Sequence, residues 1–208
     1  GNSSRPSRGQ VVSVDIDNSF YLFRLREVSE LFALDAVFKA GQLGIATALD
    51  ADGVTVAVSP DDDDVYVCLS TLPMGWNWSM YFCHGVCTDI SLSALRRANL
   101  LVGDPLRQLV CDGRVPVELA AGAPLAGPYV DNFQFLCWDS SDSDAALAAL
   151  CDVLDDYGLS HRVESRGEPR FDVVGLDIDL DQLRVSNLAK RWWRVRAALF
   201  AALEQGRM

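Results

Sequence analysis

The sequence has no apolar run that approaches the roughly 20 residues of a membrane-spanning helix. Its beginning is rich in Ser, Gly and Arg and lacks the apolar stretch of a secretory signal peptide, so we expect a flexible lead-in over residues 1–10. These two absences predict an intracellular protein, cytoplasmic or nuclear, with no membrane partner. An initiator Met is also absent, which suggests a piece of a longer product.

Side chains that bind zinc are scarce and scattered. The sequence has two histidines far apart and six cysteines without a CxxC pair, whereas a zinc site needs clustered soft ligands. Cys83, His84 and Cys87 form the one cluster, on what the pattern predicts is a buried helix face. Free cysteine is usually buried, so we favour buried, reduced thiols there over a metal site.

Positive charge is also in short supply. Eighteen Lys and Arg residues stand against 29 Asp and Glu residues, for a net charge of −11. This balance argues against nucleic-acid binding by the domain as a whole, because phosphate contacts need Lys and Arg. The charge is uneven, however: residues 61–64 are all Asp, whereas the chain from Arg184 onward carries six basic residues and one acid. Any surface for a polyanion is therefore expected at the C-terminal end.

Strands and helices are interleaved along a chain long enough for one substantial core. Apolar runs predict strands over residues 10–16, 54–58, 65–69, 106–111 and 171–174. Helical spacing predicts helices over residues 25–41, 78–97 and 143–157, the last of these capped by Ser143, and a final helix capped by Asn187. Hairpins are predicted to turn at Asp131-Asn132 and Asp181-Gln182. The pattern indicates an α+β fold with an antiparallel sheet.

Two acids occupy positions that suit metal binding. Asp15 lies near the end of a predicted buried strand, and Asp131 lies in the turn of a predicted hairpin. Phosphoryl transfer at a nucleotide uses two divalent ions roughly 3.5–4 Å apart, clamped by carboxylates. Mg²⁺ prefers one or two carboxylates together with phosphate oxygens and water. Asp is also common at strand ends and turns for structural reasons, so the pair alone does not select a function.

Residues 14–21, Val-Asp-Ile-Asp-Asn-Ser-Phe-Tyr, resemble motif A of reverse transcriptases, a strand with an Asp and an aromatic residue five positions later. The resemblance implies that Asp15 binds both metal ions and that the backbone carbonyl of Ile16 assists. It also implies that Phe20 is the steric gate that rejects a ribose 2′-hydroxyl. A flat ring against C2′ leaves no room for that oxygen.

Residues 72–79, Leu-Pro-Met-Gly-Trp-Asn-Trp-Ser, look like motif B of the same family, LPxGWxxS, and are the most specific single signal in the chain. The resemblance implies that Met74 and Gly75 contribute to nucleotide binding. Glycine there lets the backbone approach the templating base pair, and the helix that follows supports the nucleotide pocket.

Tyr129-Val130-Asp131-Asn132 resembles motif C, usually Tyr-x-Asp-Asp, on a β-turn-β hairpin. The resemblance implies that Asp131 is a direct metal ligand, with Tyr129 and Asn132 as its neighbours. Asn132 stands where the family pattern has the second Asp. Because Asn keeps an acceptor oxygen but removes one negative charge, we expect weaker metal affinity.

The C-terminal third resembles the later motifs of the family. The helix over 145–157 with Gly158-Leu159 is similar to motif D, although its general acid is assigned to no residue, and residues 171–185 resemble the hairpin that grips the primer. The helix with Trp192 and Trp193 resembles the start of a thumb, which implies contacts to the nucleic-acid backbone from Lys190, Arg191 and Arg194. The alternative is a surface helix with both Trp side chains packed inward.

Together the motifs imply a polymerase palm-type antiparallel sheet packed on helices. The implied division is a lead-in over 1–10, a reverse-transcriptase palm core over 11–186 and the start of a thumb helix over 187–208. The implied function is that of an RNA-directed DNA polymerase, a nucleotidyltransferase from a retroelement. Its cofactor would be two Mg²⁺ ions, with Mn²⁺ as an alternative. Its partners would be an RNA or DNA template with a primer, and deoxynucleoside triphosphates.

Two other interpretations stay open. The fingers and most of the thumb are missing from this chain, so we expect residues 1–208 alone to be inactive. Asn132 and the net acidity favour a catalytically inactive palm domain kept as a structural or interaction module. An acidic α+β domain with an unrelated binding function would require all three motifs to be accidents.

Overall fold

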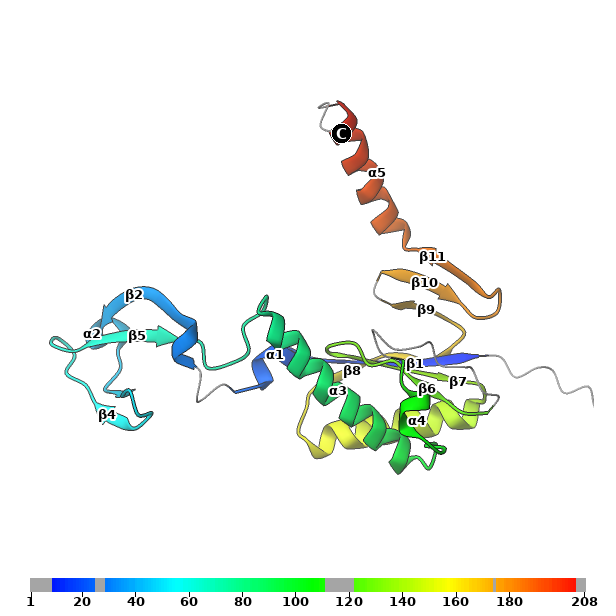
Figure 1. Ribbon diagram of the computed structural model, residues 1–208, viewed down its shortest axis with the longest axis horizontal. Helices are drawn as coiled ribbons and strands as arrows, with labels where there is room; N and C mark the ends of the chain where they lie inside the picture. The colour runs from blue at the N-terminus through cyan, green and yellow to red at the C-terminus, as the bar shows by residue number, and fades with distance from the viewer. Residues whose placement is uncertain (1–8, 25–28, 111–121, 174, 205–208) are drawn as a thin grey trace, which may run out of the picture. The chain divides into compact units, whose positions relative to one another are not determined.

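The computed structural model describes residues 9–24, 29–110, 122–173 and 175–204. The chain forms two compact units, which Figure 1 shows as ribbons. The sheet unit comprises Gly1–Asp17 and His84–Met208, and the inserted unit comprises Asn18–Cys83. The chain therefore leaves the sheet unit just after its first strand and returns to it within a long helix.

The sheet unit is built on a four-stranded antiparallel sheet with the order β6-β7-β1-β8. Its elements follow one another as β1 (Gln10–Ile16), α3 (Asn77–Arg97), β6 (Leu125–Ala126), β7 (Asn132–Cys137), α4 (Ser140–Asp156) and β8 (His161–Glu168). This is a β-α-β-β-α-β succession, with β1 in the interior of the sheet between β7 and β8. The predicted α+β class with an antiparallel sheet is confirmed.

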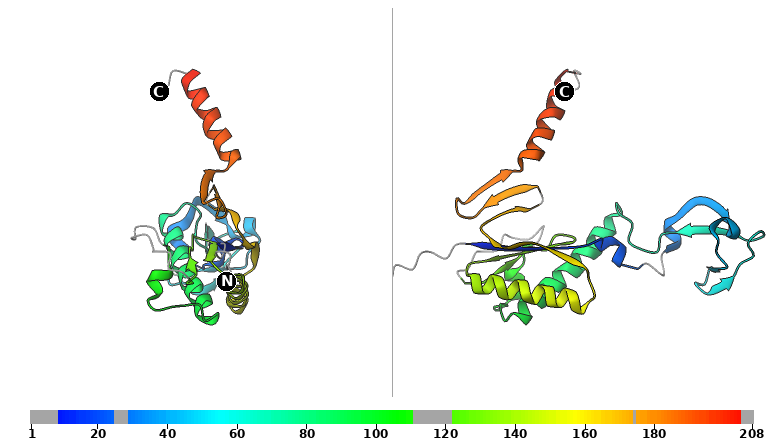
Figure 2. Two further views of the ribbon diagram at one scale, coloured as in Figure 1. Left: turned by 90° about the vertical axis from the view of Figure 1, so that its right-hand side faces the viewer. Right: turned by 180° about the vertical axis from the view of Figure 1, so that it is seen from behind.

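One face of this sheet is apolar because side chains alternate along each strand. Val12, Val14 and Ile16 of β1 join one buried cluster, together with Phe133 and Phe135 of β7. Helices α3 and α4 cover this face (Figures 1 and 2). They add apolar residues at helical spacing to the same cluster: Cys87, Ile90, Ala94, Leu95, Ala146, Leu147, Leu150, Val153 and Leu154. Within the described ranges, no helix is long and apolar enough to cross a bilayer.

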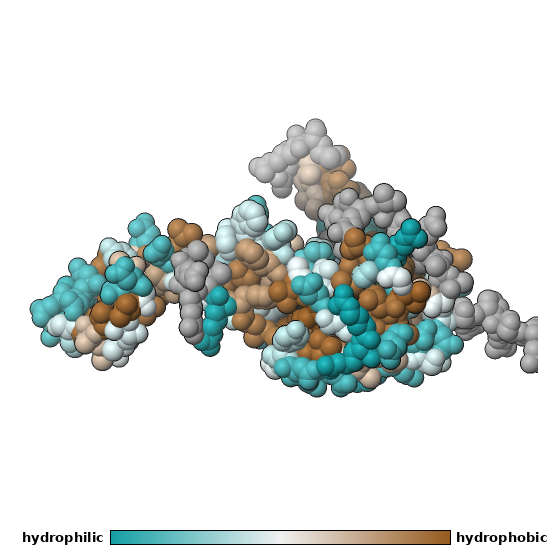
Figure 3. Space-filling view, turned by 60° about the horizontal axis from the view of Figure 1, so that its bottom comes forward, coloured by the Kyte–Doolittle hydropathy of each residue, from teal (hydrophilic) through white to brown (hydrophobic). Residues whose placement is uncertain are grey.

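The solvent side of α4 is acidic. Asp144, Asp152, Asp155 and Asp156 are all exposed there, and hydrophilic residues take up much of the surface in the space-filling view from the helix side (Figure 3). Part of the net negative charge therefore lies on the face of the sheet unit that is opposite to Asp15.

A second, three-stranded antiparallel sheet follows the first and has the order β11-β10-β9. It consists of β9 (Arg170–Val173), β10 (Leu176–Asp179) and β11 (Arg184–Asn187), and α5 (Ala189–Glu204) comes after it. Arg170 donates two hydrogen bonds to Asp177 across β9 and β10, at 2.8 and 2.7 Å. The strand predicted near 171–174 and the hairpin predicted around Asp181-Gln182 are both confirmed.

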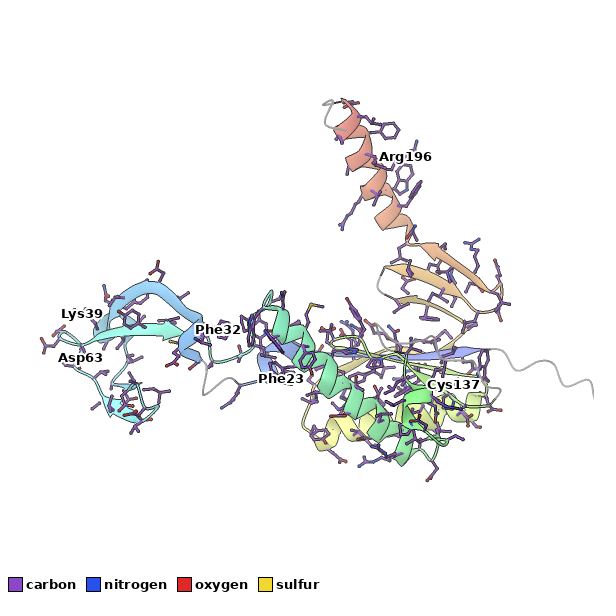
Figure 4. All side chains as sticks on the ribbon, in the orientation of Figure 1. Phe23, Phe32, Lys39, Asp63, Cys137 and Arg196 are labelled. Atoms are coloured by element: carbon purple, nitrogen blue, oxygen red, sulfur yellow. The ribbon has the colours of Figure 1, made fainter. Side chains whose placement is uncertain are left out.

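The inserted unit contains short elements joined in two antiparallel ribbons. They are α1 (Ser19–Leu22), a 3₁₀ turn (Ser29–Phe32), β2 (Ala33–Lys39), α2 (Ala40–Leu43), β3 (Thr47–Leu49), β4 (Thr55–Ala57) and β5 (Asp64–Cys68). Strand β2 pairs with β5, and β3 pairs with β4. Lys39, labelled in Figure 4, lies at the end of the β2–β5 ribbon. Its ammonium pairs with the Asp64 carboxylate at 2.7 Å and donates to the carbonyl of Asp62 at 3.0 Å.

The predicted helix over residues 25–41 is wrong over residues 33–39. Residues 33–39 form β2, whose backbone pairs with β5 through Val37 with Tyr66 and Phe38 with Val65. Apolar residues recurred there at helical spacing, but the partner strand supplies hydrogen bonds that a helix would otherwise make internally. Pairing with a distant segment has overridden a local pattern.

Two further predictions need correction. Residues 105–108 form a 3₁₀ turn that the Asp104 side chain caps, instead of a strand over 106–111; residue 111 lies outside the described residues. Helix α4 begins earlier than predicted, because Asp139 and not Ser143 is its N-cap. Ser143 lies buried in the first turns, and its hydroxyl donates to Ser140 and contacts Gln10.

Candidate active site

Asp15 lies near the end of β1 on the polar face of the sheet. It pairs across the sheet with Asn132 of β7 on one side and Arg162 of β8 on the other. Because Val14 and Ile16 face the core, the side chain of Asp15 points to the opposite face. It is 22 % exposed, so its carboxylate is partly shielded from water and still open to a ligand.

The hairpin predicted at Asp131-Asn132 is confirmed, with its turn one residue earlier than expected. The N–H of Tyr129 donates to the carbonyl of Asn132 at 2.8 Å, and the N–H of Asn132 donates back at 2.9 Å. Val130 and Asp131 therefore form the tip, and Asn132 begins β7. Val130 has a φ of 58°, a strained backbone for a β-branched residue that costs about 1–3 kcal/mol.

Three hydrogen bonds fix Asp131 beside Asp15. The N–H of Ile16 donates to the carbonyl of Asp131 at 2.9 Å, and the Asn132 amide donates to the Asp131 carboxylate at 3.0 Å. From the helix side, the buried thiol of Cys87 donates to the carbonyl of Val130 at 2.7 Å. The structure thus brings together the two acids that the sequence singled out.

The pKa of the Asp15 carboxyl reflects the burial and the charges around it. Partial burial is the largest cause that raises the pKa of the Asp15 carboxyl, and the charge of Asp131 is the next. The carboxylate of Glu164 raises that pKa further, whereas the Arg162 guanidinium lowers it. Negative charge is therefore concentrated at this end of the sheet, a condition that a bound cation relieves.

Arg162 and Glu164 are members of this group that the sequence did not identify. Nη2 of Arg162 lies 3.0 Å from Oδ2 of Asp15 and 3.2 Å from Oε1 of Glu164. The register of β1 and β8 shifts between Ser13 and Val14, which leaves Glu164 as the extra residue of a β-bulge. Bulges re-aim side chains and occur often beside active sites. The only signal in the sequence was two charged residues, two positions apart, in a segment without strand-like apolar character.

His161 belongs to the other face. Its ring Nδ1 lies 3.0 Å from the carbonyl of Leu159 and 3.8 Å from a carboxylate oxygen of Asp155, and its side chain is 13 % exposed. In register it stands opposite Ile16, whose side chain is in the core. Of the basic residues near the motif D-like segment, the structure therefore places Arg162 at Asp15 and His161 beneath the sheet.

The donor chemistry of this group fits a hard cation. Asp15 and Asp131 offer carboxylate oxygens, and Mg²⁺ typically takes one or two carboxylates and completes its shell with water and phosphate. Among the described residues, no three His, Cys, Asp or Glu side chains converge as a ready-made metal site. A cation held here would therefore rely on the two Asp residues and on ligands brought by a substrate.

Protonation of Asp15 is expected to stabilise the fold. The pKa of its carboxyl lies above 3.8 in the folded chain, so its contribution to stability is full below 3.8 and is lost as pH rises through the folded pKa. At pH 7 the Asp15 carboxyl therefore contributes less to stability than it does below pH 3.8. Asp15→Asn is expected to raise the melting temperature at pH 7 by about 1–3 °C, and the gain should shrink as pH falls toward 3.8. An unchanged or lower melting temperature at pH 7 would contradict this.

The motif B-like segment lies in the inserted unit and the start of α3. The N–H of Trp76 donates to the carbonyl of Pro73 at 3.2 Å and closes a turn, in which Gly75 has a φ of 98°. Only glycine adopts that φ readily. The hydroxyl of Ser79 donates to the same carbonyl at 2.8 Å and joins the turn to the helix. The pattern of Pro, Gly and Ser thus has a local structural reason.

The other residues that the resemblance predicts at a nucleotide lie in the same unit. Phe20 is half-buried in α1, and the N-cap of that helix is Asn18, whose φ is 55°. Met74 is 68 % exposed in the turn before α3. The roles of Phe20, Met74 and Gly75 at a nucleotide, and that of the Ile16 carbonyl at a metal ion, stay predictions.

A groove of about 230 Å³ runs along the polar face beside the hairpin. One wall comes from the hairpin and β8, and the other from the β9–β10 turn, where Gly175 has a φ of 81°. The lining residues are Tyr129, Asn132, Gln134, Glu164, Asp172, Val173 and Gly175. The segment that resembles a primer-gripping hairpin therefore lies next to the segment that resembles motif C.

Helix α5 presents its aromatic residues to solvent. Trp192 and Trp193 are 53 % and 62 % exposed, so the alternative in which both pack inward is wrong. Arg196 lies over the rings of Trp193 and Phe200, at 5.3 and 5.5 Å from their centroids (Figure 4). Arg194 is exposed on the same helix, whereas the side chains of Lys190 and Arg191 lie outside the described residues.

Comparison with known proteins gives similarity at the level of solved structures. No family model matches the chain, and no curated protein matches it. The chain is similar to apo telomerase from Candida tropicalis, with 14 % identity, a TM-score of 0.42, and coverage of 90 % of this chain and 36 % of that one. It is also similar to telomerase from Candida albicans in complex with a fragment of telomeric RNA, with 14 % identity, a TM-score of 0.43, and coverage of 86 % and 31 %. The chain thus spans about a third of each.

Proposed function

We propose that this chain is the palm core of a reverse transcriptase from a retroelement. Within a longer protein it would add deoxynucleotides to a primer 3′-hydroxyl under the direction of an RNA or DNA template. One observation carries the proposal: Asp15 and Asp131 meet on the polar face of a β-α-β-β-α-β sheet, and the charge of Asp131 raises the pKa of Asp15.

The proposed chemistry assigns little covalent work to the protein. When bound, Mg²⁺ or Mn²⁺ would lower the pKa of the attacking hydroxyl and offset charge on the phosphoryl oxygens. Asp15 and Asp131 would hold the cations, with the Ile16 carbonyl as a further ligand. Their partial burial and fixed hydrogen bonds orient the carboxylates before substrate arrives, which lowers the cost of reorganisation.

The proposal assigns a surface to each substrate. The primer would lie in the groove between the hairpin and the β9–β10 turn, with its 3′-end near Asp131. Phe20 would exclude a 2′-hydroxyl, and Met74 and Gly75 would contact the incoming nucleotide. Basic residues of α5, Lys190, Arg191 and Arg194, would contact the nucleic-acid backbone, away from the acidic surface of α4.

A second candidate is a catalytically inactive palm domain that serves as a structural or interaction module. Two observations favour it. Arg162 already occupies the Asp15 carboxylate, and Asn132 donates its amide to Asp131 where the family pattern has a further carboxylate. Both reduce the negative charge available to a metal ion.

Primer extension by the full-length parent, with Mg²⁺ and deoxynucleoside triphosphates, tests the proposal. Asn132→Asp restores one negative charge beside Asp131 and is expected to raise incorporation at limiting Mg²⁺ by about tenfold. The same substitution should lower the Mg²⁺ concentration that gives half the maximal rate. If neither the parent protein nor its Asn132→Asp variant incorporates nucleotide, in Mg²⁺ or in Mn²⁺, the result supports the inactive module instead.

A further inference from the structure

The contacts of Arg162 place a positive charge between two acids. A single guanidinium nitrogen, Nη2, contacts Oδ2 of Asp15 at 3.0 Å and Oε1 of Glu164 at 3.2 Å. Because both oxygens touch one atom, they lie no more than about 6 Å apart. The β-bulge in β8 turns Glu164 toward this point. Two carboxylates thus surround one cation, which is the guanidinium of Arg162.

An added cation would bind the same carboxylate and meet the charge of Arg162 there. Oδ2 of Asp15 cannot accept from Arg162 at 3.0 Å and coordinate a divalent ion at about 2.1 Å in the same direction. The charge of Arg162 also lowers the pKa of the Asp15 carboxyl, in opposition to burial, Asp131 and Glu164. A divalent ion and the guanidinium therefore compete for one carboxylate.

Arg162 is free to leave this position. Its side chain is 63 % exposed, so a rotation of the guanidinium into water loses little packing. Ion pairs with an exposed partner contribute little to stability, and a divalent ion carries twice the charge of the guanidinium. The pair is strong enough to neutralise the site without a cation and weak enough to yield to one.

We propose that Arg162 is a displaceable internal counter-ion of the Asp15 site, held between Asp15 and Glu164 until a divalent cation replaces it. The inference rests on the proposed function, because it takes Asp15 as a cation ligand. Arg162 is then a positioning residue that sets the affinity of the site for metal. It keeps the carboxylates together without substrate and raises the concentration of cation that the site needs.

Direct cation binding tests this in the 208-residue chain. The free Mn²⁺ signal in electron paramagnetic resonance gives the Mn²⁺ dissociation constant without any need for catalysis. Arg162→Gln is expected to bind Mn²⁺ about fivefold more tightly than the unchanged chain. Arg162→Lys keeps the positive charge and should stay within about twofold of the unchanged chain. Arg162→Met, which keeps the apolar stem, repeats the charge removal if the Gln variant folds poorly.

Arg166 provides the matched control for net charge. It lies on the same strand and is exposed, but it pairs in register with Val12. It also lies near Cys151. Burial and the charge of Asp155 raise the pKa of the Cys151 thiol, whereas Arg166 lowers that pKa. Arg166→Gln removes the same charge away from Asp15 and should change the Mn²⁺ dissociation constant by less than about twofold. Equal gains from the Arg162 and Arg166 variants, or no gain from the Arg162 variants that remove the charge, would overturn the counter-ion role.

Asp15→Asn separates this inference from the proposed function. If Asp15→Asn weakens Mn²⁺ binding while Arg162→Gln leaves it unchanged, Asp15 binds a cation and only the counter-ion role is lost. If Asp15→Asn has no effect on Mn²⁺ binding, Asp15 is not a cation ligand, and the proposed function and the counter-ion role fail together.

Discussion

Asp131→Ala in the full-length parent is expected to lower primer extension at least about 1000-fold. The carboxylate is proposed to hold the metal ions that stabilise the charged transition state, a contribution of several kcal/mol. Alanine removes the carboxylate and leaves the backbone bond from Ile16 to the carbonyl of residue 131 in place. The loss should therefore appear in the rate at saturating nucleotide, measured by single-turnover extension of a labelled primer.

Asp152→Ala is the control for this substitution. Asp152 is exposed on α4, beneath the sheet, so its loss changes the net charge equally without touching the polar face. Its extension rate should stay within about threefold of the parent. A comparable loss from both substitutions, or less than about a tenfold loss from Asp131→Ala, would count against Asp131 as a metal ligand.

Phe135→Ala is expected to lower the free energy of unfolding by about 3–5 kcal/mol. Phe135 is fully buried at the centre of β7 and belongs to the cluster that joins β1, β7, α3 and α4. Its removal leaves a cavity between the sheet and both helices, which close packing does not allow to collapse completely. Urea unfolding followed by circular dichroism measures the change. Because the total free energy of unfolding of natural domains is small, this loss should be a large fraction of it.

Gln134→Ala is the matched control for Phe135→Ala, because Gln134 lies on the other face of β7. Gln134 precedes Phe135 on β7 but lines the polar groove, so its truncation should change the free energy of unfolding by about 0.5 kcal/mol or less. Similar losses from the two variants would mean that the alternation of faces along β7 is not as described.

Local patterns predicted the parts of the fold that depend on local chemistry. The β-branched apolar run over residues 10–16 identified β1, and turn residues between apolar runs identified the hairpin at Asp131 within one position. The Pro, Gly and Ser of residues 72–79 have defined roles in one turn. Motif order then supplied the pairing of Asp15 with Asp131, which no local pattern contains.

The sequence did not reveal features that depend on a distant partner. Strand β8 carries charged residues through its length, and only its pairing with β1 makes it a strand. Strand β2 is likewise a strand because β5 lies beside it. Arg162 and Glu164 could not be placed at Asp15 without the register and the bulge, since a shift of one residue would send them to the other face.

The thiol of Cys87 and the strained backbone of Val130 have a joint consequence. A positive φ at a valine persists only where surrounding contacts stabilise it. Here the thiol of Cys87, a buried residue of α3, donates a hydrogen bond to the carbonyl of Val130 in the turn. The turn that carries Asp131 is thus a cooperative part of the hydrophobic core, and it does not behave as an independent surface loop. The Asp131 carboxylate is expected to stay in position while α3 is packed, and the turn and α3 should unfold together as one cooperative unit.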